Sequence, residues 1–174
     1  KYFSDTNDLS NSSFFLPYLS GERTPHNDPY IRGSFHSMKT TTNATNLQYA
    51  VIEGISFGIL DGVNSILKVN NNFEKIFMVG GGSKSKFWIQ LLASLLNRKL
   101  SVCDQSEFGA ALGVARLAMY VNKNIDAKEN IIKEINVSKS FNPNQDKIDL
   151  LLKRYNIWRD IYSSNKKIAS NLLA

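Results

Sequence analysis

The sequence is poor in cysteine and has no long apolar run, and both absences limit what the protein can be. Cys103 is the only cysteine in 174 residues, so no disulfide can form within the chain, and we expect a reducing, cytoplasmic location. Cys103 follows Val102 in a predicted strand, which favours a small core residue over a nucleophile. No signal peptide is recognisable, and Glu53 and Asp61 interrupt the longest apolar stretch. We therefore expect no membrane partner.

A strong excess of one charge is also missing. The formal net charge is +6, and residues 121–174 carry ten Lys and Arg against six Asp and Glu. No interleaving of basic and aromatic residues accompanies this excess, so we expect a solvated basic surface and no nucleic-acid partner. The hydrophobic fraction of 43% and the aromatic fraction of 11% describe one packed domain that buries about 70% of its unfolded surface.

One stretch, residues 75–97, organises the chain. Ile76–Val79 is a short apolar run typical of a strand covered on both faces, and three glycines, Gly80–Gly82, end it. A helix capped by Ser83 or Ser85 should follow, because apolar residues then recur at helical spacing. These apolar residues are Phe87, Trp88, Leu91, Leu92, Leu95 and Leu96.

The three glycines lack a Cβ, so a phosphate or a flat base could approach their backbone closely. The start of the next helix would add unpaired N–H groups and a positive dipole end, which suits an anionic ligand. A tight corner between strand and helix explains the glycines equally well. The pattern is not a P-loop, because no Gly-Lys-Ser/Thr closes it, and it is not a dinucleotide fingerprint, because Ser85 stands where the last glycine would be.

The rest of the chain predicts alternating strands and helices, the order of an α/β layered structure. Residues 1–13 should be a loop or a frayed end, and Pro17 limits the strand that begins at Phe14. Further strands are expected at 32–38 and 99–104, and helices at about 45–69, 107–121 and after Pro143. Residues 122–142 are polar and lysine-rich, with a short helix proposed at 127–135. The terminal helix should dock on the body through Ile148, Leu152, Tyr155, Trp158 and Tyr162.

The long helix at 45–69 carries Gly54, Gly58 and Gly62 at four-residue spacing. Each costs roughly 1 kcal/mol relative to alanine, so we expect another backbone to approach closely there. Glu53 could be catalytic, but a structural role is favoured. In the later helix Gly109 and Gly113 repeat the four-residue spacing, for which close packing alone and a functional role are equally weighted.

Residues 20–29 form a polar loop with two prolines. His26 and Asp28 could act there as a base and its orienting carboxylate. A single histidine in a surface loop more often has no such role, so the function of this loop stays open from its composition.

Four segments resemble the FGGY carbohydrate kinases of the actin-like ATPase superfamily. Val79–Ser85, followed by Phe87-Trp88, looks like the nucleotide-side loop of that family. Phe15–Asn27 is similar, nearly residue for residue, to the loop of members that phosphorylate D-xylulose, whereas members acting on glycerol or gluconate carry related but different loops. Residues 32–53 resemble the second family signature, except that Ser37 occupies a usual glycine position. Gly109–Ala115 resembles a helix at the nucleotide end of the cleft.

The resemblance implies that the chain is the C-terminal, nucleotide-side half of a kinase with RNase H-like domains, and that this half is incomplete. Its core would lie at residues 14–121, and residues 122–174 would be a helical extension of the same domain. Such an enzyme uses ATP and Mg²⁺ to phosphorylate a sugar, and D-xylulose is the first candidate for that sugar. The backbone of Gly81 and Gly82 should line the ATP site. Ser83, Ser85 and Lys86 should lie beside them.

By the same resemblance, the catalytic base and most sugar contacts belong to an N-terminal domain outside these residues. We therefore expect no catalytic residue and no metal ligand in this chain, and no kinase activity from it alone. The implied partners are the sugar, the N-terminal domain and, as an open question, a second copy. Alternatives are a kinase of L-ribulose, gluconate or glycerol, a non-catalytic actin-like nucleotide-binding module, or a fragment that only dimerises.

Overall fold

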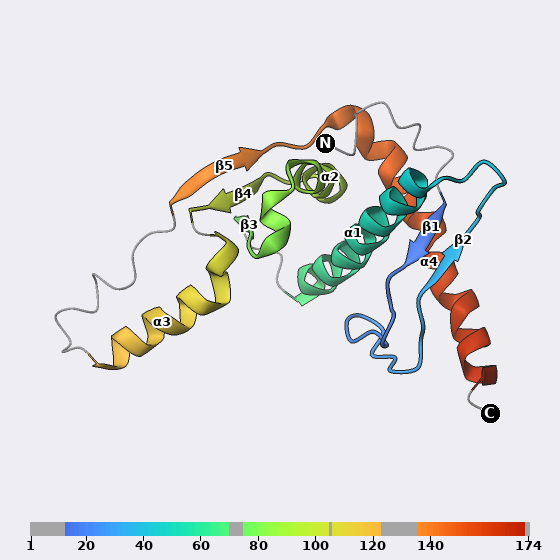
Figure 1. Cartoon of the computed structure of the whole chain (residues 1–174), viewed down its shortest axis with the longest axis horizontal. Coiled ribbons are helices and arrows are strands. Elements are labelled where there is room, and N and C mark those ends of the chain that lie inside the picture. Colours follow the sequence, from blue (N-terminus) through green and yellow to red (C-terminus); the bar gives the residue numbers. More distant parts are fainter. Residues whose placement is uncertain (1–12, 70–74, 105, 123–135, 173–174) are drawn as a thin grey trace.

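The computed structural model describes residues 13–69, 75–104, 106–122 and 136–172. Its strands are β1 (Phe14–Leu16), β2 (Ser34–His36), β3 (Ile76–Met78), β4 (Leu100–Cys103) and β5 (Val137–Phe141). Its α-helices are α1 (Ala44–Val69), α2 (Lys86–Leu96), α3 (Gly109–Asn122) and α4 (Gln145–Leu172), and the short 3-10 helices η2 (Gly81–Lys84) and η3 (Ser106–Phe108) lead into α2 and α3 (Figure 1). The predicted mixed α/β order is confirmed.

The strands form two small sheets. β1 and β2 pair antiparallel, whereas β4 lies between β3, to which it is parallel, and β5, to which it is antiparallel. The sequence predicted no strand within the polar segment 122–142, whereas residues 137–141 form β5. This strand pairs through its backbone at the sheet edge, and only Phe141 among its side chains is partly buried, so its composition does not reveal it. The helix proposed for 127–135 lies outside the described residues.

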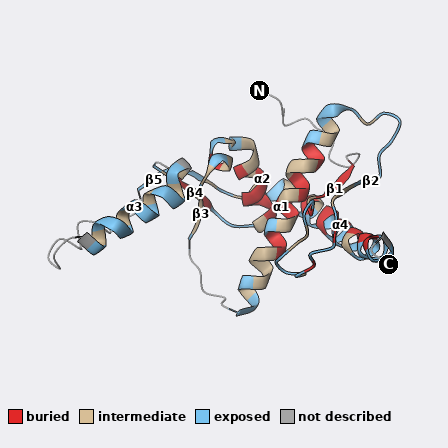
Figure 2. Cartoon of the chain, turned by 60° about the horizontal axis from the view of Figure 1, so that its bottom comes forward, coloured by how far each residue is buried: buried red, intermediate tan, exposed pale blue. Residues whose placement is uncertain are grey.

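The core forms where α1, α2, α4 and β1 meet, and Figure 2 shows the buried residues concentrated there. Trp158 and Phe57 are its largest fully buried side chains. A second cluster packs Ile89 and Leu92 of α2 against Leu100 and Val102 of β4. No described side chain of α3 is buried.

The terminal helix α4 docks on the body as predicted. The indole of Trp158 is 1% exposed and donates a hydrogen bond to the carbonyl of Phe15, 2.8 Å away. Leu152 was placed on the docking face but is 39% exposed, and its neighbour Leu151 is fully buried instead. Ile148, Tyr155 and Trp158 are buried and Tyr162 packs against the core, so the predicted face is confirmed except at Leu152.

Helix α1 is long and apolar enough, by length and composition alone, to cross a membrane, and 39% of its most apolar window is buried inside the structure. Its acidic residues Glu53 and Asp61 lie in the chain's own core. The carboxylate of Glu53 pairs with the guanidinium of Arg154 at 2.6 Å. Helix α1 packs against β1, α2 and α4, as the core helix of a folded domain does. The structural role favoured for Glu53 agrees with this pairing.

Close backbone approach explains only one of the three glycines of α1. A Cβ built on Gly54 would lie 2.1 Å from the carbonyl oxygen of Phe15, so β1 crosses the helix there. A Cβ on Gly58 would make ordinary contact with the ring of Pro17, and one on Gly62 would meet nothing. Among the described residues, the expectation holds for Gly54 and was wrong for Gly58 and Gly62.

Strand β3 is less covered than its sequence predicted. Ile76, Phe77 and Met78 are only half-buried, and Val79, directly after them, is 56% exposed. The expectation of a strand covered on both faces was wrong for the described residues, because β3 is an edge strand there, hydrogen-bonded to β4 alone.

Candidate functional site

The glycine turn after β3 is held in one conformation by its own backbone. Gly80 has φ +79°, a region that side-chain-bearing residues rarely adopt, so glycine is required at this position. Its N–H donates to the carbonyl of Ser106 at 2.7 Å, and its carbonyl accepts from the N–H of Ser83 at 3.1 Å. The turn after β3 is thereby tied to the turn after β4, at the same edge of the sheet.

The two glycines predicted to line a ligand site have different surroundings. A Cβ on Gly81 would meet nothing within 4 Å, so its backbone is open to an incoming group. A Cβ on Gly82 would lie 2.7 Å from the ring of Trp88, whose indole N–H is held by Ser56 at 2.9 Å. Packing against Trp88 is therefore sufficient to explain Gly82, and only Gly81 of the pair is unexplained by the fold.

The hydroxyl groups of this turn are used within the protein. Ser83 is buried, and its Oγ donates to the carbonyl of Gly80 at 2.7 Å and lies 2.9 Å from the Oγ of Ser106. Ser85 is the N-cap of α2, where its Oγ accepts from the N–H of Trp88 at 3.3 Å. Of the two serines proposed as the cap, Ser85 therefore fills the role for α2.

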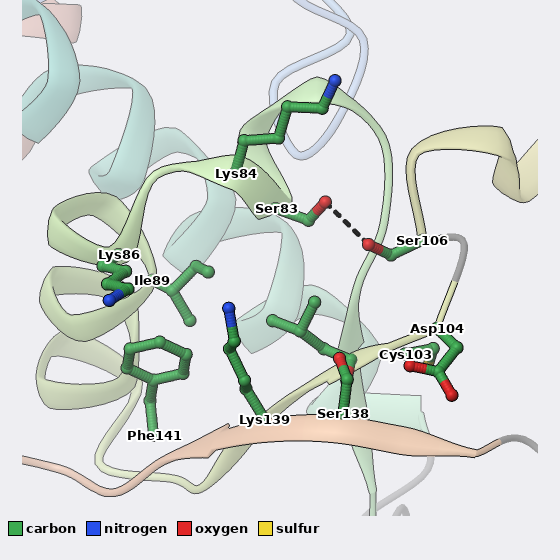
Figure 3. A pocket seen from close by; sticks show the side chains of 11 residues that line it. Ser83, Lys84, Lys86, Ile89, Cys103, Asp104, Ser106, Ser138, Lys139 and Phe141 are labelled. Carbon is green, nitrogen blue, oxygen red and sulfur yellow. Dashed lines mark hydrogen bonds between the residues drawn. The ribbon is translucent and has the colours of Figure 1, made fainter.

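A cavity of about 290 Å³ lies between the start of α2 and the strands β4 and β5 (Figure 3). Figure 3 shows the ammonium group of Lys139 pointing from β5 into this space, and the Ser83–Ser106 pair bounding it. The lining residues are Ser83, Lys84, Lys86, Ile89, Val102, Cys103, Asp104, Ser106, Ser138, Lys139 and Phe141. Three lysines against one aspartate make its wall positive.

The cavity therefore brings together only part of the predicted site. Ser83 and Lys86 line it, whereas Gly81, Gly82 and Ser85 do not. The sequence did not indicate Ser106 or Lys139. Ser106 follows β4 with no motif around it, and Lys139 belongs to the unpredicted strand β5.

Cys103 lies at this cavity but is not poised as a nucleophile. Burial, with a contribution from the negative charge of Asp104, raises the pKa of its thiol above the usual range. A thiol is a poor nucleophile until it ionises, so the protonated form predominates at neutral pH.

The polar loop before β2 does not pair His26 with Asp28. The Asp28 carboxylate accepts the N–H groups of Tyr30 and Ile31 and the hydroxyl of Tyr162. The His26 ring stacks on Tyr162, with centroids 3.6 Å apart, and its Nε2 lies 3.8 Å from a carboxylate oxygen of Asp61 instead. The loop is thus fastened to α4 and α1, and the proposed base and orienting carboxylate are not partners.

Within the described ranges, no group of three or more His, Cys, Asp or Glu side chains is arranged to hold a metal ion.

Residues 4–121 match the C-terminal domain of the FGGY family of carbohydrate kinases, and the chain belongs to this family. A xylulose kinase from Staphylococcus epidermidis is 34% identical over 165 residues, which are 94% of this chain and 33% of that protein. A crystal structure of a xyloylose kinase from Brucella ovis matches with a TM-score of 0.80 and 30% identity, over 95% of this chain and 34% of its own.

A crystal structure of a gluconate kinase from Lactobacillus acidophilus matches with a TM-score of 0.68 and 29% identity, over 87% of this chain and 31% of its own. The chain thus spans about a third of the length of each of these relatives. These relatives are named for different sugars, although their sequence identities to this chain, 29% to 34%, are similar.

Proposed function

We propose that this chain is the nucleotide-side part of an ATP-dependent sugar kinase, with the RNase H-like fold of the actin-like ATPases and D-xylulose as its acceptor. The observation that carries the proposal is the open backbone of Gly81, in a turn that the family match includes and that leads into α2. Residues 14–121 would form the core of the domain, and residues 122–174 its extension.

Only some of the residues of this turn are placed to bind ATP. Gly81 offers an unobstructed backbone. Lys84, at the end of η2, and Lys86, at the start of α2, add positive charge that attracts a polyphosphate over a short, salt-screened range. Gly82, Ser83 and Ser85 would act mainly by holding the turn, since Trp88, Gly80 and the α2 backbone engage them. This division refines the expectation that the backbone of Gly81 and Gly82 lines the ATP site, with Ser83, Ser85 and Lys86 beside them.

Bound ATP with Mg²⁺ would supply the γ-phosphoryl group, while the metal offsets phosphate charge. This chain would bind and orient the adenosine and α-phosphate end. The carboxylate that accepts the proton of the sugar hydroxyl would come from the N-terminal part of the polypeptide, so residues 1–174 alone should be inactive. A cytoplasmic location is consistent with this activity.

D-Xylulose is the first candidate because of the loop Phe15–Asn27 and the xylulose kinase from Staphylococcus epidermidis. Gluconate is the second, because the gluconate kinase structure is almost as similar in sequence.

The decisive experiment measures ATP consumption by the full-length polypeptide with Mg²⁺ and, in turn, D-xylulose, L-ribulose, gluconate and glycerol, with residues 1–174 as the control. We expect turnover on D-xylulose and none from the control. Turnover on another acceptor would keep the kinase and change the sugar. ATP hydrolysis that no sugar affects would favour a nucleotide-binding module, and activity of the control would refute the assignment of the base to another part.

The role of the turn is tested separately by Gly81→Ala in the full-length polypeptide. The new Cβ meets no protein atom, so the melting temperature should be unchanged, while the KM for ATP should rise about tenfold or more. Gly62→Ala, which also enters open space but on α1, is the matched control and should leave the KM for ATP unchanged. An unchanged KM in Gly81→Ala would remove Gly81 from the site.

A further inference from the structure

The cavity between α2, β4 and β5 lies apart from the turn residue Gly81 and from β3. None of its lining residues belongs to β3, and Gly81 is not among them. Hydrogen bonding places β5 at the edge of the sheet opposite to β3. The cavity volume of about 290 Å³ is at the lower end of the range for small-molecule pockets, roughly 300–1,000 Å³, so it suits a small metabolite.

The hydroxyl groups at this cavity have already used their protons within the protein. Ser83 donates its proton to the carbonyl of Gly80, so Ser106 is the donor in the 2.9 Å contact between the two serine hydroxyls. Ser138 donates to the carbonyl of Val102 at 3.0 Å. Only lone pairs of these oxygens remain, so the hydroxyls face a ligand as acceptors.

The donors that remain for a ligand are ammonium groups. Lys86 of α2 and Lys139 of β5 line the cavity, and neither side chain has a hydrogen bond or an ion pair with another described residue. Figure 3 shows the Lys139 ammonium pointing into the space, whereas Lys84 is directed away from it. Lysine ammonium groups bind phosphate as point charges, so this side of the cavity favours a phosphate group.

The rest of the cavity wall offers a further acceptor and an apolar surface. Asp104 lies across the cavity from Lys86 in Figure 3, and its carboxylate accepts no hydrogen bond from another described residue. An ionised carboxylate is an acceptor only, so its donors have to come from a ligand or from solvent. Ile89, Val102 and Phe141 line the space with carbon, including one aromatic ring. A ligand with a phosphate at one end, several hydroxyl groups and a C–H surface matches all of these groups.

We propose that this cavity is a second ligand site, which binds a phosphorylated sugar. The phosphate lies against Lys86 and Lys139, and the sugar hydroxyls donate to the Asp104 carboxylate and the Ser106 hydroxyl. The site is separate from the proposed ATP site at Gly81, and its assignment does not depend on that function. A consequence that does rest on the proposed function is that the product of the kinase belongs to the same class of ligand.

A simple inorganic anion is the weaker occupant. It has no donors for the serine lone pairs, and it would bring negative charge into a cavity that already holds the carboxylate of Asp104. A sugar phosphate uses the same lysines and also supplies the donors that the acceptors need.

Calorimetric titration of the full-length polypeptide with D-xylulose 5-phosphate, and separately with D-glucose 6-phosphate, tests the site. A saturating non-hydrolysable ATP analogue is present, so that the proposed ATP site and its phosphate positions are filled. At least one of the two sugar phosphates should still bind. Failure of both to bind, with and without the analogue, would overturn the proposal, and so would binding that the analogue abolishes.

Lys139→Met removes the charge that belongs to the cavity alone, and should weaken sugar phosphate binding about tenfold or more. Lys139 is exposed, so the melting temperature should not change. Lys153→Met, at an exposed position of α4, removes the same charge outside the cavity and should leave binding unchanged. Equal affinities of the two variants would show that the ligand lies elsewhere, and the proposal would be wrong.

Asp104→Asn separates a sugar phosphate from a simple anion. An amide accepts a hydroxyl proton less strongly than a carboxylate does, so the variant should bind the sugar phosphate about fivefold more weakly. Inorganic phosphate, used as the second probe, should bind the variant as well as or better than the unsubstituted protein, because a repelling charge is gone. If Asp104→Asn strengthens the binding of both probes, the carboxylate only repels, the cavity holds an adventitious ion only, and the proposal is overturned.

Discussion

Arg154 of α4 holds the buried carboxylate of Glu53 of α1 through two hydrogen bonds, from Nε to Oε1 at 2.7 Å and from Nη2 to Oε2 at 2.6 Å. The guanidinium also lies over the ring of Phe14, 4.3 Å from its centroid. Glu53 is 1% exposed and Arg154 is 5% exposed, so water solvates neither charge well. This pair fastens the terminal helix to the central helix.

Arg154→Met should lower the free energy of unfolding by about 3–5 kcal/mol, because it leaves a buried carboxylate without its counter-charge. Urea denaturation of residues 1–174 at neutral pH measures the change. The double variant Glu53→Gln with Arg154→Met removes both charges and keeps an acceptor for the Tyr49 hydroxyl, so it should recover most of the loss. No recovery in the double variant would mean that Arg154 acts through packing and not through the charge of Glu53.

Tyr162→Phe should destabilise the chain by about 1 kcal/mol at pH 7, because the hydroxyl bonded to Asp28 is lost while the stacking on His26 is kept. Burial alone would raise the pKa of Asp28. The hydrogen bonds from the N–H of Tyr30, the hydroxyl of Tyr162 and the N–H of Ile31 outweigh it and hold the pKa below its usual value.

A carboxyl group with a lowered folded-state pKa stabilises the fold above its unfolded pKa of about 4 and loses that contribution as the pH falls through the folded value. The difference between wild type and Tyr162→Phe should therefore shrink as the pH is lowered from 7 through about 4 to 3. Denaturation curves at a series of pH values check this. A constant difference would show that the hydroxyl stabilises the fold independently of the charge on Asp28.

Gly54→Ala and Gly62→Ala should have opposite effects although the two residues lie on one helix. The first places a methyl group against the Phe15 carbonyl and should cost at least about 2 kcal/mol, because backbone must move. The second enters open space and should stabilise the helix by up to about 1 kcal/mol. Thermal melts of the two variants suffice, and two changes of the same sign would contradict the packing of β1 on α1.

Ser37→Gly should stabilise the chain by about 1 kcal/mol. Ser37 has φ +59°, in the left-handed region where a Cβ is unfavourable, and its side chain is exposed. The resemblance described above implies glycine at this position, so the departure noted in the sequence coincides with a positive φ. Ser34→Gly, in β2 and without a positive φ, is the control and should destabilise. A loss of stability in Ser37→Gly would mean that its side chain makes a contact worth more than the strain.

Local patterns in the sequence were sufficient for the order of the four α-helices and of the strands β1 to β4. Three features could be recognised in a single sequence: the apolar run before Gly80, the helix cap at Ser85 and the apolar face of α4. Each of them depends on residues that are close together in the chain. β5 was missed because an edge strand is defined by backbone pairing and needs no apolar pattern.

The candidate site was predicted less completely than the fold. The turn Gly80–Gly82 was found from its spacing, and the family followed from the residues around it. The sequence could not predict that Gly82 packs against Trp88 while the backbone of Gly81 stays open. This difference depends on where the indole ring of Trp88 lies once α2 has packed.

By itself, then, the sequence determined the α/β order, the position of the glycine turn and membership of the carbohydrate kinase family. Only the tertiary structure decided that Glu53 pairs with a residue 101 positions away, that β1 crosses α1 at Gly54 and not at Gly62, and that β3 and α3 are left uncovered. Periodicity and turn chemistry act between near neighbours, whereas these contacts depend on how whole helices and strands pack.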